Sequence, residues 1–394
     1  MKHLPEHLQA LIGQPVQHID TPALVVDLDA MERNIERMAR FAQQHRVLWR
    51  PHAKLHKSVQ IAHLLEQAGA YGHCVQKVSE AEALAAGGIT NIFISNEVIA
   101  PAKLARIAAL AKALNAQGGR LALAVDGEEG IIRLAQAMEH AQAGDAAIDV
   151  LVEINVGQNR CGVEPGEPAV ALAQAIAAQP TLRFAGLQAY HGGAQHLRTA
   201  EERKTAIAQV IQRVHRTRHA LDRAGIAIPL ITGAGTGTMV NEAASGVYGE
   251  IQPGSFLFMD ADYAANQRDA AQPPFEHALY VKTQVMSRSP QHAVCDAGHK
   301  AHAIDSGLPK LHALPAENAL RFANGGDEHG VLHPDSAAGN TLGWLPALGE
   351  TLWLIPGHCD PTVNLHDHLI GVRGGLLAGV VERIFTVDGR GALT

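Results

Sequence analysis

The stretch that decides the fold occupies residues 50–57 and reads Arg50-Pro51-His52-Ala53-Lys54-Leu55-His56-Lys57. It follows the apolar run 47–49 and precedes a stretch of helical character at 58–68, so a strand gives way to a helix here. Parallel α/β folds keep their chemistry at such junctions. We therefore interpret Lys54 as a reactive amine, and we expect Arg50 and Lys57 to lower its pKa. From these eight residues alone, a solvated loop lysine remains the alternative.

Apolar segments alternate with helical segments on both sides of this junction. The expected strands are 47–52, 72–76, 91–96, 121–126, 148–156, 183–190, 228–233 and 250–258, and the segments between them, such as 101–116, 128–142 and 200–224, read as helices. Alternation of this kind implies parallel pairing through right-handed crossovers. The number of strands favours a closed barrel over an open sheet. An earlier strand, 22–29, precedes a helix at about 30–44 that Asp29 is placed to cap.

The pattern of apolar and polar residues changes beyond Asp260. Helical periodicity almost disappears, and short β-prone runs at 278–281, 351–355 and 377–381 are separated by Gly, Pro, Asn and Asp. We therefore predict an α/β protein with a (β/α)8 TIM barrel at 20–262 and an all-β domain at 263–394, on which residues 1–19 could pack. The second domain is rich in side chains that can bind metals, namely Asp296, His299, His302, Asp305, Asp327, Glu328, His329, His358, Asp360, His366, Asp367 and His368.

Composition excludes several classes of function. The 394 residues carry a formal net charge of −7, which gives no electrostatic reason to expect nucleic acid or an anionic membrane as a partner. The N-terminus lacks a secretory signal, and no apolar run approaches the roughly 18 residues of a membrane-spanning helix. The four scattered cysteines suggest neither a zinc ribbon nor a disulfide framework. We expect a soluble protein in the reducing cytoplasm.

Three places in the expected barrel look suited to a phosphorylated aromatic cofactor. Thr232-Gly233-Ala234-Gly235-Thr236-Gly237-Thr238 follows the seventh strand, and Glu250-Ile251-Gln252-Pro253-Gly254-Ser255 accompanies the eighth. Glycine there lets backbone N–H groups approach an anion, and this end of barrels favours phosphate. The third place is formed by polar side chains at the ends of the fifth and sixth strands, namely Arg160, Tyr190 and His191. Simple structural turns are the alternative for each loop.

A pair of metal-capable residues stands near the end of the chain, in Pro356-Gly357-His358-Cys359-Asp360. On an extended backbone, residues two apart point to one face, so His358 and Asp360 could hold one divalent cation while Cys359 points away. Nitrogen and oxygen ligands without thiolate favour Mn²⁺, Mg²⁺ or Co²⁺ over structural zinc. The turn 324–330 could orient these ligands or could be a polar turn only.

The combination of these motifs resembles the D-threonine aldolases, which share the alanine racemase type of pyridoxal-phosphate fold with the D-serine dehydratase-like enzymes. The similarity runs from about Thr21 to the C-terminus. It rests on Arg-Pro-His-Ala-Lys-x-His-Lys at 50–57, Gln-Ala-Tyr-His-Gly at 188–192, the glycine-rich loop, Asp-Glu-His-Gly at 327–330 and His-x-Asp at 358–360. The resemblance implies that Lys54 carries pyridoxal 5′-phosphate, that a homodimer forms, and that further residues hold the ring and the phosphate: Gln76, Arg160, Tyr190, Gly235, Thr236, Gly254 and Ser255. His358 and Asp360 match the family's metal ligands.

The activity implied by this resemblance is retro-aldol cleavage of D-threonine and related D-β-hydroxy-α-amino acids to glycine and an aldehyde. We expect a divalent ion, Mn²⁺ first, to polarise the β-hydroxyl, and a base such as His191 to take its proton. Gln252 stands where alanine racemases have an arginine, which argues against racemase activity. Asp360 stands where the dehydratases have a cysteine. The alternatives are a D-serine or 3-hydroxyaspartate dehydratase and a non-enzymatic pyridoxal-phosphate carrier.

Overall fold

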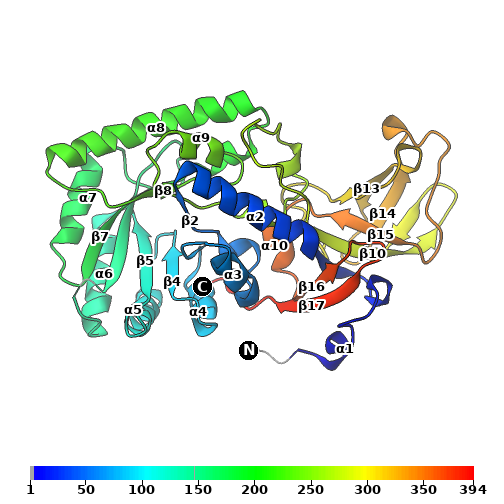
Figure 1. Cartoon of the computed structure of the whole chain (residues 1–394), viewed down its shortest axis with the longest axis horizontal. Helices are drawn as coiled ribbons and strands as arrows, with labels where there is room; N and C mark the ends of the chain where they lie inside the picture. Colours follow the sequence, from blue (N-terminus) through cyan, green and yellow to red (C-terminus); the bar gives the residue numbers. More distant parts are fainter. Residues whose placement is uncertain (1–3, 146) are drawn as a thin grey trace.

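A closed parallel barrel forms the first part of the computed structural model, which describes residues 4–145 and 147–394 (Figure 1). Its eight strands follow the order β2-β9-β8-β7-β6-β5-β4-β3. The two ends of this order meet because His52 and Cys74 form a parallel bridge, in which the Cys74 N–H donates to the Pro51 carbonyl at 3.0 Å. The predicted (β/α)8 barrel is therefore confirmed, and its closure lies directly before Lys54.

Each expected strand position contains a strand; β5 and β7 have the predicted length with a shift of one residue, and the other six are shorter than predicted. They are β2 Leu48–Trp49, β3 His73–Val75, β4 Asn91–Ile94, β5 Arg120–Val125, β6 Ile148–Glu153, β7 Leu182–Ala189, β8 Ile231–Gly233 and β9 Glu250–Ile251. The eighth strand ends early because residues 255–257 turn into the 3-10 helix η4, Ser255–Leu257. The helices around the barrel are α2 Leu28–His45, α3 Val59–Gln67, α4 Val78–Ala86, α5 Pro101–Asn115, α6 Glu128–His140, α7 Glu167–Ala177, α8 Ala200–Arg223 and α9 Met239–Ala244.

The cap of α2 differs from the prediction. Asp27, not Asp29, occupies the N-cap, and its carboxylate accepts a hydrogen bond from the Ala30 N–H at 3.1 Å. Asp29 lies in the first turn and accepts instead from the Gly374 N–H and from Arg373 of the second domain. The helix therefore begins two residues earlier, because the preceding strand ends at Asp27 and not at residue 29.

The second sheet is mainly antiparallel and lies beside the barrel (Figure 1). Its order is β13-β14-β11-β10-β1-β16-β17, with β15 paired to β10 and to β12. The strands are β1 Ala23–Asp27, β10 Leu279–Arg288, β11 Ala293–Cys295, β12 Lys310–Leu311, β13 Leu320–Asn324, β14 Gly330–Pro334, β15 Thr351–Ile355, β16 His368–Arg373 and β17 Val380–Thr386; α10, Cys359–Val363, lies between β15 and β16. The predicted β-rich second part is confirmed.

The first strand of the chain lies in this second sheet. Residues 23–27 fall within the range 20–262 that we assigned to the barrel, yet β1 pairs antiparallel with β10 and parallel with β16. The segment before it also packs there. The short helix α1, Glu6–Gln9, precedes Val16 and Ile19, which are buried against the second sheet, and the Gly13 N–H donates to the Val381 carbonyl at 2.8 Å. Residues 1–3 lie outside the described part.

Side chains fill the barrel interior, so the site cannot lie at its centre. Cys74, Phe93, Ala124 and Leu151 are buried as a cluster between the strands. The helices pack their apolar faces on the outside of the sheet and form a larger core. Ligands therefore meet the barrel at the C-terminal ends of its strands, as in other barrels of this kind. Within residues 4–145 and 147–394, no helix has both the length and the apolar character needed to cross a membrane.

Candidate active site

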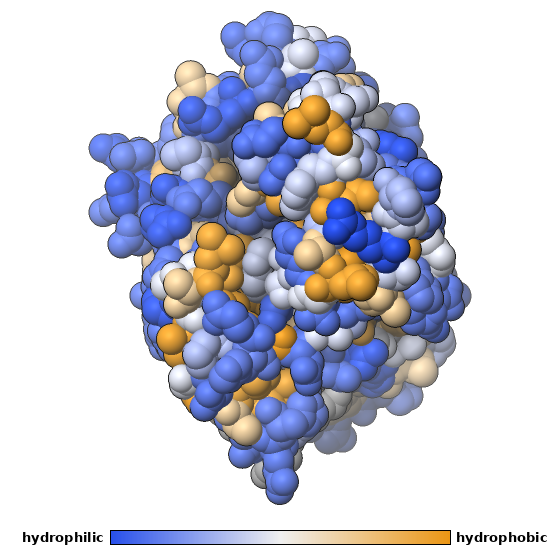
Figure 2. Space-filling view, turned by 90° about the vertical axis from the view of Figure 1, so that its right-hand side faces the viewer, coloured by the Kyte–Doolittle hydropathy of each residue, from blue (hydrophilic) through white to orange (hydrophobic). Residues whose placement is uncertain are grey.

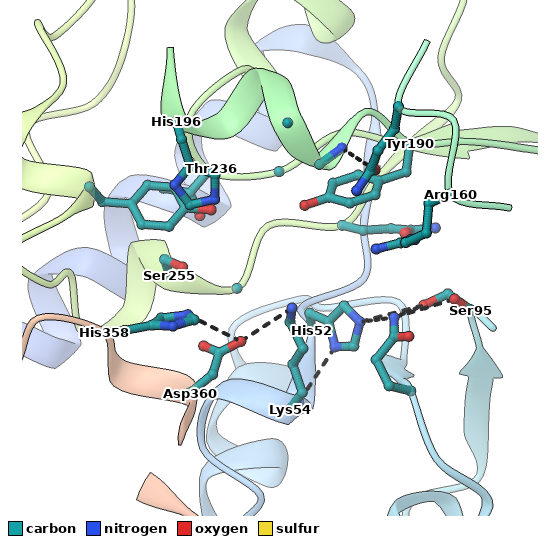
Figure 3. Close-up of a pocket in the computed structure, with 18 of the residues that line it drawn as sticks. His52, Lys54, Ser95, Arg160, Tyr190, His196, Thr236, Ser255, His358 and Asp360 are labelled. Carbon is teal, nitrogen blue, oxygen red and sulfur yellow. Dashed lines mark hydrogen bonds and ion pairs between the residues drawn. The ribbon is translucent and has the colours of Figure 1, made fainter. Parts of the chain in front are cut away.

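A cavity of about 400 Å³ opens at the C-terminal ends of the barrel strands and is bounded by α10 on the side of the second domain (Figure 3). Most of the residues predicted for the site line it together. They are Lys54, Gln76, Arg160, Tyr190, Gly235, Thr236, Gly254, Ser255, His358 and Asp360. The lining also contains residues to which sequence reasoning gave no role, namely His52, Ser95, Gln158, Gln188, Gly192, Gly193, His196 and Tyr263. His191 is not part of the lining.

Lys54 lies in the 3-10 helix η2, Ala53–Leu55, which begins immediately after the barrel closes. Its amine points across the cavity to Asp360 of α10, with Nζ 3.2 Å from Oδ2 (Figure 3). The Asp360 carboxylate raises the pKa of Lys54, and burial opposes it without prevailing. The expected lowering of this pKa by neighbouring cations is therefore wrong for the protein without metal or cofactor.

The two cations expected to act on Lys54 are engaged elsewhere. Arg50 donates through Nε to Glu250 at 3.0 Å, at the opposite, N-terminal end of the barrel. Lys57 is buried and lies 3.2 Å from Glu80 and 2.8 Å from the side-chain oxygen of Asn364, just beyond α10. Each carries a nearby partner that offsets its charge, so neither presents an unpaired cation to Lys54.

A neutral imidazole lies beside the reactive lysine. Burial, followed by the charge of Lys54, holds the pKa of His52 well below its usual range. Its Nδ1 accepts from the Lys54 N–H at 3.4 Å, and its Nε2 lies 3.0 Å from the amide nitrogen of Gln76. Gln76 also donates to Ser95 at 3.1 Å. His52 therefore presents an uncharged aromatic face to the cavity, positioned by strands β3 and β4.

Arg160 and Tyr190 form the opposite wall. The guanidinium carbon of Arg160 lies 6.0 Å from the centre of the Tyr190 ring, and both side chains point into the cavity (Figure 3). Burial raises the pKa of Tyr190, so its hydroxyl stays protonated. Behind Arg160, at the ends of β4, β5 and β6, lie the carboxyl groups of Glu97, Asp126 and Glu153. Burial, together with Glu97, raises the pKa of Glu153.

Two loops close the cavity at the end expected for phosphate. Ser255 begins η4, and Thr236 accepts from the Phe256 N–H at 2.9 Å, so the two loops are bonded to each other. A side chain at either glycine would be crowded by its neighbours. A Cβ at Gly235 would lie 2.5 Å from the Gln195 side-chain oxygen, and one at Gly254 would lie 3.3 Å from His52. Gly235, Thr236, Gly254 and Ser255 all line the cavity, and the binding of phosphate by these glycine and hydroxyl groups stays a prediction.

The side chain of Gln252, a neutral amide, lies in this wall, where the resemblance to alanine racemases would place an arginine. Its nitrogen donates to the side-chain oxygens of Gln188 and Thr232, each at 2.8 Å. Thr232 in turn donates to Glu250 at 2.8 Å. The chain of hydrogen bonds holds an uncharged group where the resemblance places the ring nitrogen of the cofactor. A pyridoxal ring with a phosphate fits these walls, because the cavity has an amine, an aromatic wall and an anion cradle.

His358 and Asp360 come from α10 of the second domain, and their side chains meet as predicted. His358 Nε2 lies 4.0 Å from Asp360 Oδ2. The reason given from sequence is wrong, because the extended backbone ends at His358, the N-cap of α10, and Asp360 lies in the first turn of that helix. Two donor atoms this close can share one ion, since bonds of about 2.1 Å reach atoms up to about 4.2 Å apart. A divalent cation therefore fits.

Asp305 supports His358. Its Oδ2 lies 2.7 Å from His358 Nδ1, which leaves Nε2 toward Asp360. Burial opposes the charged imidazole, but Asp360 and Asp305 raise the pKa of His358 overall. The turn 324–330 does not provide this support, because Asp327 lies 2.8 Å from His299 and 3.1 Å from Lys300. Sequence reasoning counted Asp305 among the metal-capable residues without giving it this role.

His191 faces away from the cavity, and His196 faces into it. The Nδ1 of His191 accepts from the Ala194 N–H at 3.2 Å, and its Nε2 lies near Gly157, where Arg213 also packs. Burial, followed by the charge of Arg213, lowers the pKa of His191. His196 closes the 3-10 helix η3, Gly192–His196, and lines the cavity (Figure 3).

A second group of metal-capable atoms lies near Arg160. Atoms of Glu97, Asp126 and Cys161 lie within 4.8 Å of one another. This group is separate from His358 and Asp360, and none of its three members lines the cavity.

Known proteins match nearly the whole chain. The alanine racemase N-terminal domain matches residues 26–262, and a domain described as a putative serine dehydratase domain matches residues 278–372. A D-threonine aldolase of Arthrobacter sp is 44% identical over 96% of this chain and 95% of its own length. A 3-hydroxy-D-aspartate aldolase of Paracoccus denitrificans (strain Pd 1222) is 41% identical over 98% of this chain and 95% of its own.

Structural comparison agrees with these matches. The crystal structure of a D-threonine aldolase from Filomicrobium marinum superposes with a TM-score of 0.90 at 47% identity, covering 97% of this chain and 99% of that one. A D-threo-3-hydroxyaspartate dehydratase of Delftia sp. (strain HT23) is a more distant relative, 30% identical over 87% of this chain and 92% of its own.

Proposed function

The chain belongs to the family of the D-threonine aldolases, and from this premise we propose that it cleaves D-threonine and related D-β-hydroxy-α-amino acids to glycine and an aldehyde. The alanine racemase type of fold implies pyridoxal phosphate as the cofactor. We further propose that a divalent metal is required, with Mn²⁺ preferred and Mg²⁺ or Co²⁺ able to replace it.

One observation carries this proposal: the amine of Lys54 and the carboxylate of Asp360 lie 3.2 Å apart across one cavity. The cavity therefore combines an amine that suits an aldehyde cofactor with a histidine–carboxylate pair that suits a metal. Both can act on one substrate. The neighbouring thiol takes no part, because Cys359 is buried and donates to the Met259 carbonyl at 3.4 Å. Oxygen and nitrogen donors alone are typical of sites for Mn²⁺ and Mg²⁺.

The proposed roles of the residues follow from where they lie. When bound, pyridoxal phosphate supplies an electron sink for the cleaved carbon–carbon bond, and the metal supplies a Lewis acid for the β-hydroxyl. Lys54 holds the cofactor aldehyde, and His52 lies against the ring. Gln76, Arg160 and Tyr190, which line the same cavity, would hold the ring and its substituents. Gly235, Thr236, Gly254 and Ser255 bind the phosphate.

His196 replaces His191 as the group that takes the β-hydroxyl proton. A base must come within hydrogen-bond reach of the proton that it removes, and only a side chain that reaches the cavity can do so. His196 lines the same cavity as His358 and Asp360, whereas His191 packs against Gly157 outside it. The earlier assignment followed sequence proximity to the strand end, which does not decide which way a loop side chain turns.

A dehydratase of D-serine or 3-hydroxyaspartate is the second candidate. The match of residues 278–372 to a putative serine dehydratase domain favours it. Against it stand the higher identities to two aldolases and the carboxylate of Asp360 in place of a thiolate. A non-enzymatic carrier is less supported, because α10 of the second domain contributes His358 and Asp360 to the cavity.

We also propose a homodimer in the cytoplasm. Figure 2 shows the end of the molecule formed by the second sheet, where apolar side chains gather in several patches on a polar surface. The exposed apolar residues of the second domain include Met286, Leu342, Leu348 and Leu377. Apolar surface of this kind is typical of contacts between subunits. All four cysteines are free, which is consistent with a reducing compartment.

The test uses purified protein with pyridoxal phosphate and Mn²⁺, incubated separately with D-threonine, L-threonine and D-3-hydroxyaspartate. We expect acetaldehyde and glycine from D-threonine, no product from the L-isomer, and loss of activity on addition of a chelator. Acetaldehyde and 2-oxobutanoate are assayed in the threonine samples, and glyoxylate and oxaloacetate in the D-3-hydroxyaspartate sample. Formation of 2-oxobutanoate without acetaldehyde would assign the protein to the dehydratases, and turnover of none of these substrates would favour the carrier.

A further inference from the structure

The imidazole of His196 is held by a carboxylate outside the cavity. His196 Nδ1 lies 2.6 Å from Oδ2 of Asp262, and its ring centre lies 5.8 Å from that of Tyr263. Asp262 does not line the cavity, whereas His196 and Tyr263 do. The Nδ1 edge of the ring is therefore turned to Asp262, and the opposite edge, with Nε2, faces the substrate space.

Asp262 is itself fixed. Its side chain is only 8% exposed, against 49% for that of His196. Arg198 donates to the Asp262 carboxylate, and its Nη1 also donates to the Asp262 carbonyl and to Asn266, each at 2.8 Å. Burial opposes the ionised form, but hydrogen bonds from Arg198 and His196 lower the pKa of Asp262 overall. The carboxylate is therefore charged at neutral pH and is held beside the ring by its contacts with Arg198.

A carboxylate can only accept, so a neutral His196 that bonds to it carries its proton on Nδ1. Nε2 then has a lone pair directed into the cavity, which is the form that a general base requires. Arg198 offsets the charge of Asp262 and leaves this tautomer unchanged.

We propose that Asp262 is a positioning residue, which fixes the tautomer and the orientation of His196 so that Nε2 takes the β-hydroxyl proton of the substrate. This inference rests on the proposed aldolase function. Proton transfer goes from the substrate hydroxyl to Nε2 while the carbon–carbon bond breaks, and the aldehyde leaves with the oxygen. Asp262 forms no bond to the substrate.

Two reactions of the same holoenzyme separate this role from a structural one. Cleavage of D-threonine requires loss of the hydroxyl proton, whereas exchange of a glycine α-hydrogen in D₂O uses the same lysine and cofactor but has no hydroxyl. We expect Asp262→Asn to lower kcat for cleavage by about 10–100-fold and His196→Ala by about 100-fold or more. Both variants should exchange the glycine hydrogen within about twofold of the wild-type rate.

The controls make each outcome decisive. Asp222→Asn, at an exposed carboxylate of α8, should change neither rate. In the His196→Ala background, Asp262→Asn should cause no further loss, because both residues act through one group. This comparison holds even if Asp262→Asn lowers stability. Equal slowing of cleavage and exchange, additive losses, or an unchanged rate of cleavage in Asp262→Asn would each overturn the proposal. If the wild-type protein exchanges glycine but does not cleave D-threonine, the proposed function fails instead.

Discussion

The two sides of the active-site cavity are built in different ways. On the barrel side, Lys54, Gln76, Arg160 and Tyr190 follow strands that are hydrogen-bonded to neighbours on both sides. On the other side, His358 and Asp360 depend on α10, a helix of five residues. The geometry of the barrel side is fixed by a closed sheet, whereas the geometry of the α10 side is fixed by a few hydrogen bonds.

Those few contacts come largely from the barrel. The Cys359 N–H donates to Asp260 at 3.0 Å, the Ala261 N–H donates to the Pro356 carbonyl at 2.9 Å, and Lys57 holds Asn364 at 2.8 Å. The position of His358 and Asp360 relative to the amine of Lys54 is therefore set by contacts between the two parts of the molecule. We expect substitutions on the barrel side to change cofactor binding, and substitutions in α10 to change activation by the metal.

The largest expected effect follows from removing the barrel-side amine. Lys54→Ala should abolish the absorbance of lysine-bound cofactor and lower cleavage of D-threonine by at least about 10³-fold, because no other amine in the lining can hold the cofactor aldehyde. Absorption spectra and acetaldehyde release measure the two effects. Lys204→Ala, at a side chain that is 68% exposed, is the matched control and should resemble the wild type. A retained cofactor spectrum in Lys54→Ala would refute the assignment.

Loss of the proposed metal ligands should leave the cofactor bound to Lys54. His358→Ala and Asp360→Ala are expected to lower cleavage by about 100-fold or more and to remove the response to Mn²⁺, because each deletes one of two donor atoms. The cofactor absorbance should remain. Titration with Mn²⁺, followed by activity and by spectrum, tests this separation. Full activation of either variant by Mn²⁺ would show that the ion binds elsewhere, and the group formed by Glu97, Asp126 and Cys161 would be the next candidate.

A smaller effect is expected from the carboxylate behind His358. Asp305→Asn should weaken activation by Mn²⁺ by about 10–100-fold while activity at saturating metal stays within a few-fold of wild type, because Asp305 orients the His358 ring. Asp327→Asn, in the exposed turn of the same domain, should leave the metal titration unchanged. Equal effects of the two substitutions would remove the special role of Asp305.

The smallest effect concerns stability on the barrel side. Burial raises the pKa of Glu242, which lies in α9 and accepts a hydrogen bond from Thr238, to about 7. The folded state therefore binds more protons than the unfolded state, and its stability falls as the pH rises from the usual range of a glutamate through about 7. Glu242→Gln removes this dependence. The free energy of unfolding of the cofactor-free variant, relative to wild type, should increase by about 1–3 kcal/mol between pH 5 and 8. A difference that is constant with pH would contradict this, and urea unfolding at each pH provides the measurement.

The sequence predicts those parts of the site whose signals are local. The eight strands and the residues that follow them, including Lys54, Arg160 and Tyr190, can be found because strand ends in a parallel barrel converge. Gly235 and Gly254, which line the cavity, can be found because glycine-rich loops after the last two strands are typical of phosphate sites in barrels. The meeting of His358 with Asp360 was also predicted, although the helical turn that brings them together was not.

Contacts between distant residues account for what the sequence could not provide. His196 becomes useful because Asp262, 66 residues later, holds it, and Asp305 because His358 lies 53 residues beyond it. The pKa of Lys54 was predicted in the wrong direction because Asp360, far away in the sequence, lies 3.2 Å from its amine and raises that pKa. Glu250 and Glu80, which engage Arg50 and Lys57, cannot be seen from the local motif either. No periodicity or spacing signals these pairs. In each case the two partners are far apart in the sequence and come into contact only in the folded protein.

The position of β1 has a consequence for how the chain is made. This strand is synthesised before the barrel, yet both of its partners, β10 and β16, follow the barrel in sequence. In topological terms the barrel is an insertion between the first strand of the second sheet and the rest of it. On the ribosome the barrel strands can pair as they emerge, while residues 23–27 have no sheet to join until β10 arrives. The second sheet, and with it the placement of α10, therefore cannot be completed before β16 has been synthesised, so His358 and Asp360 reach Lys54 only after nearly the whole chain has been made.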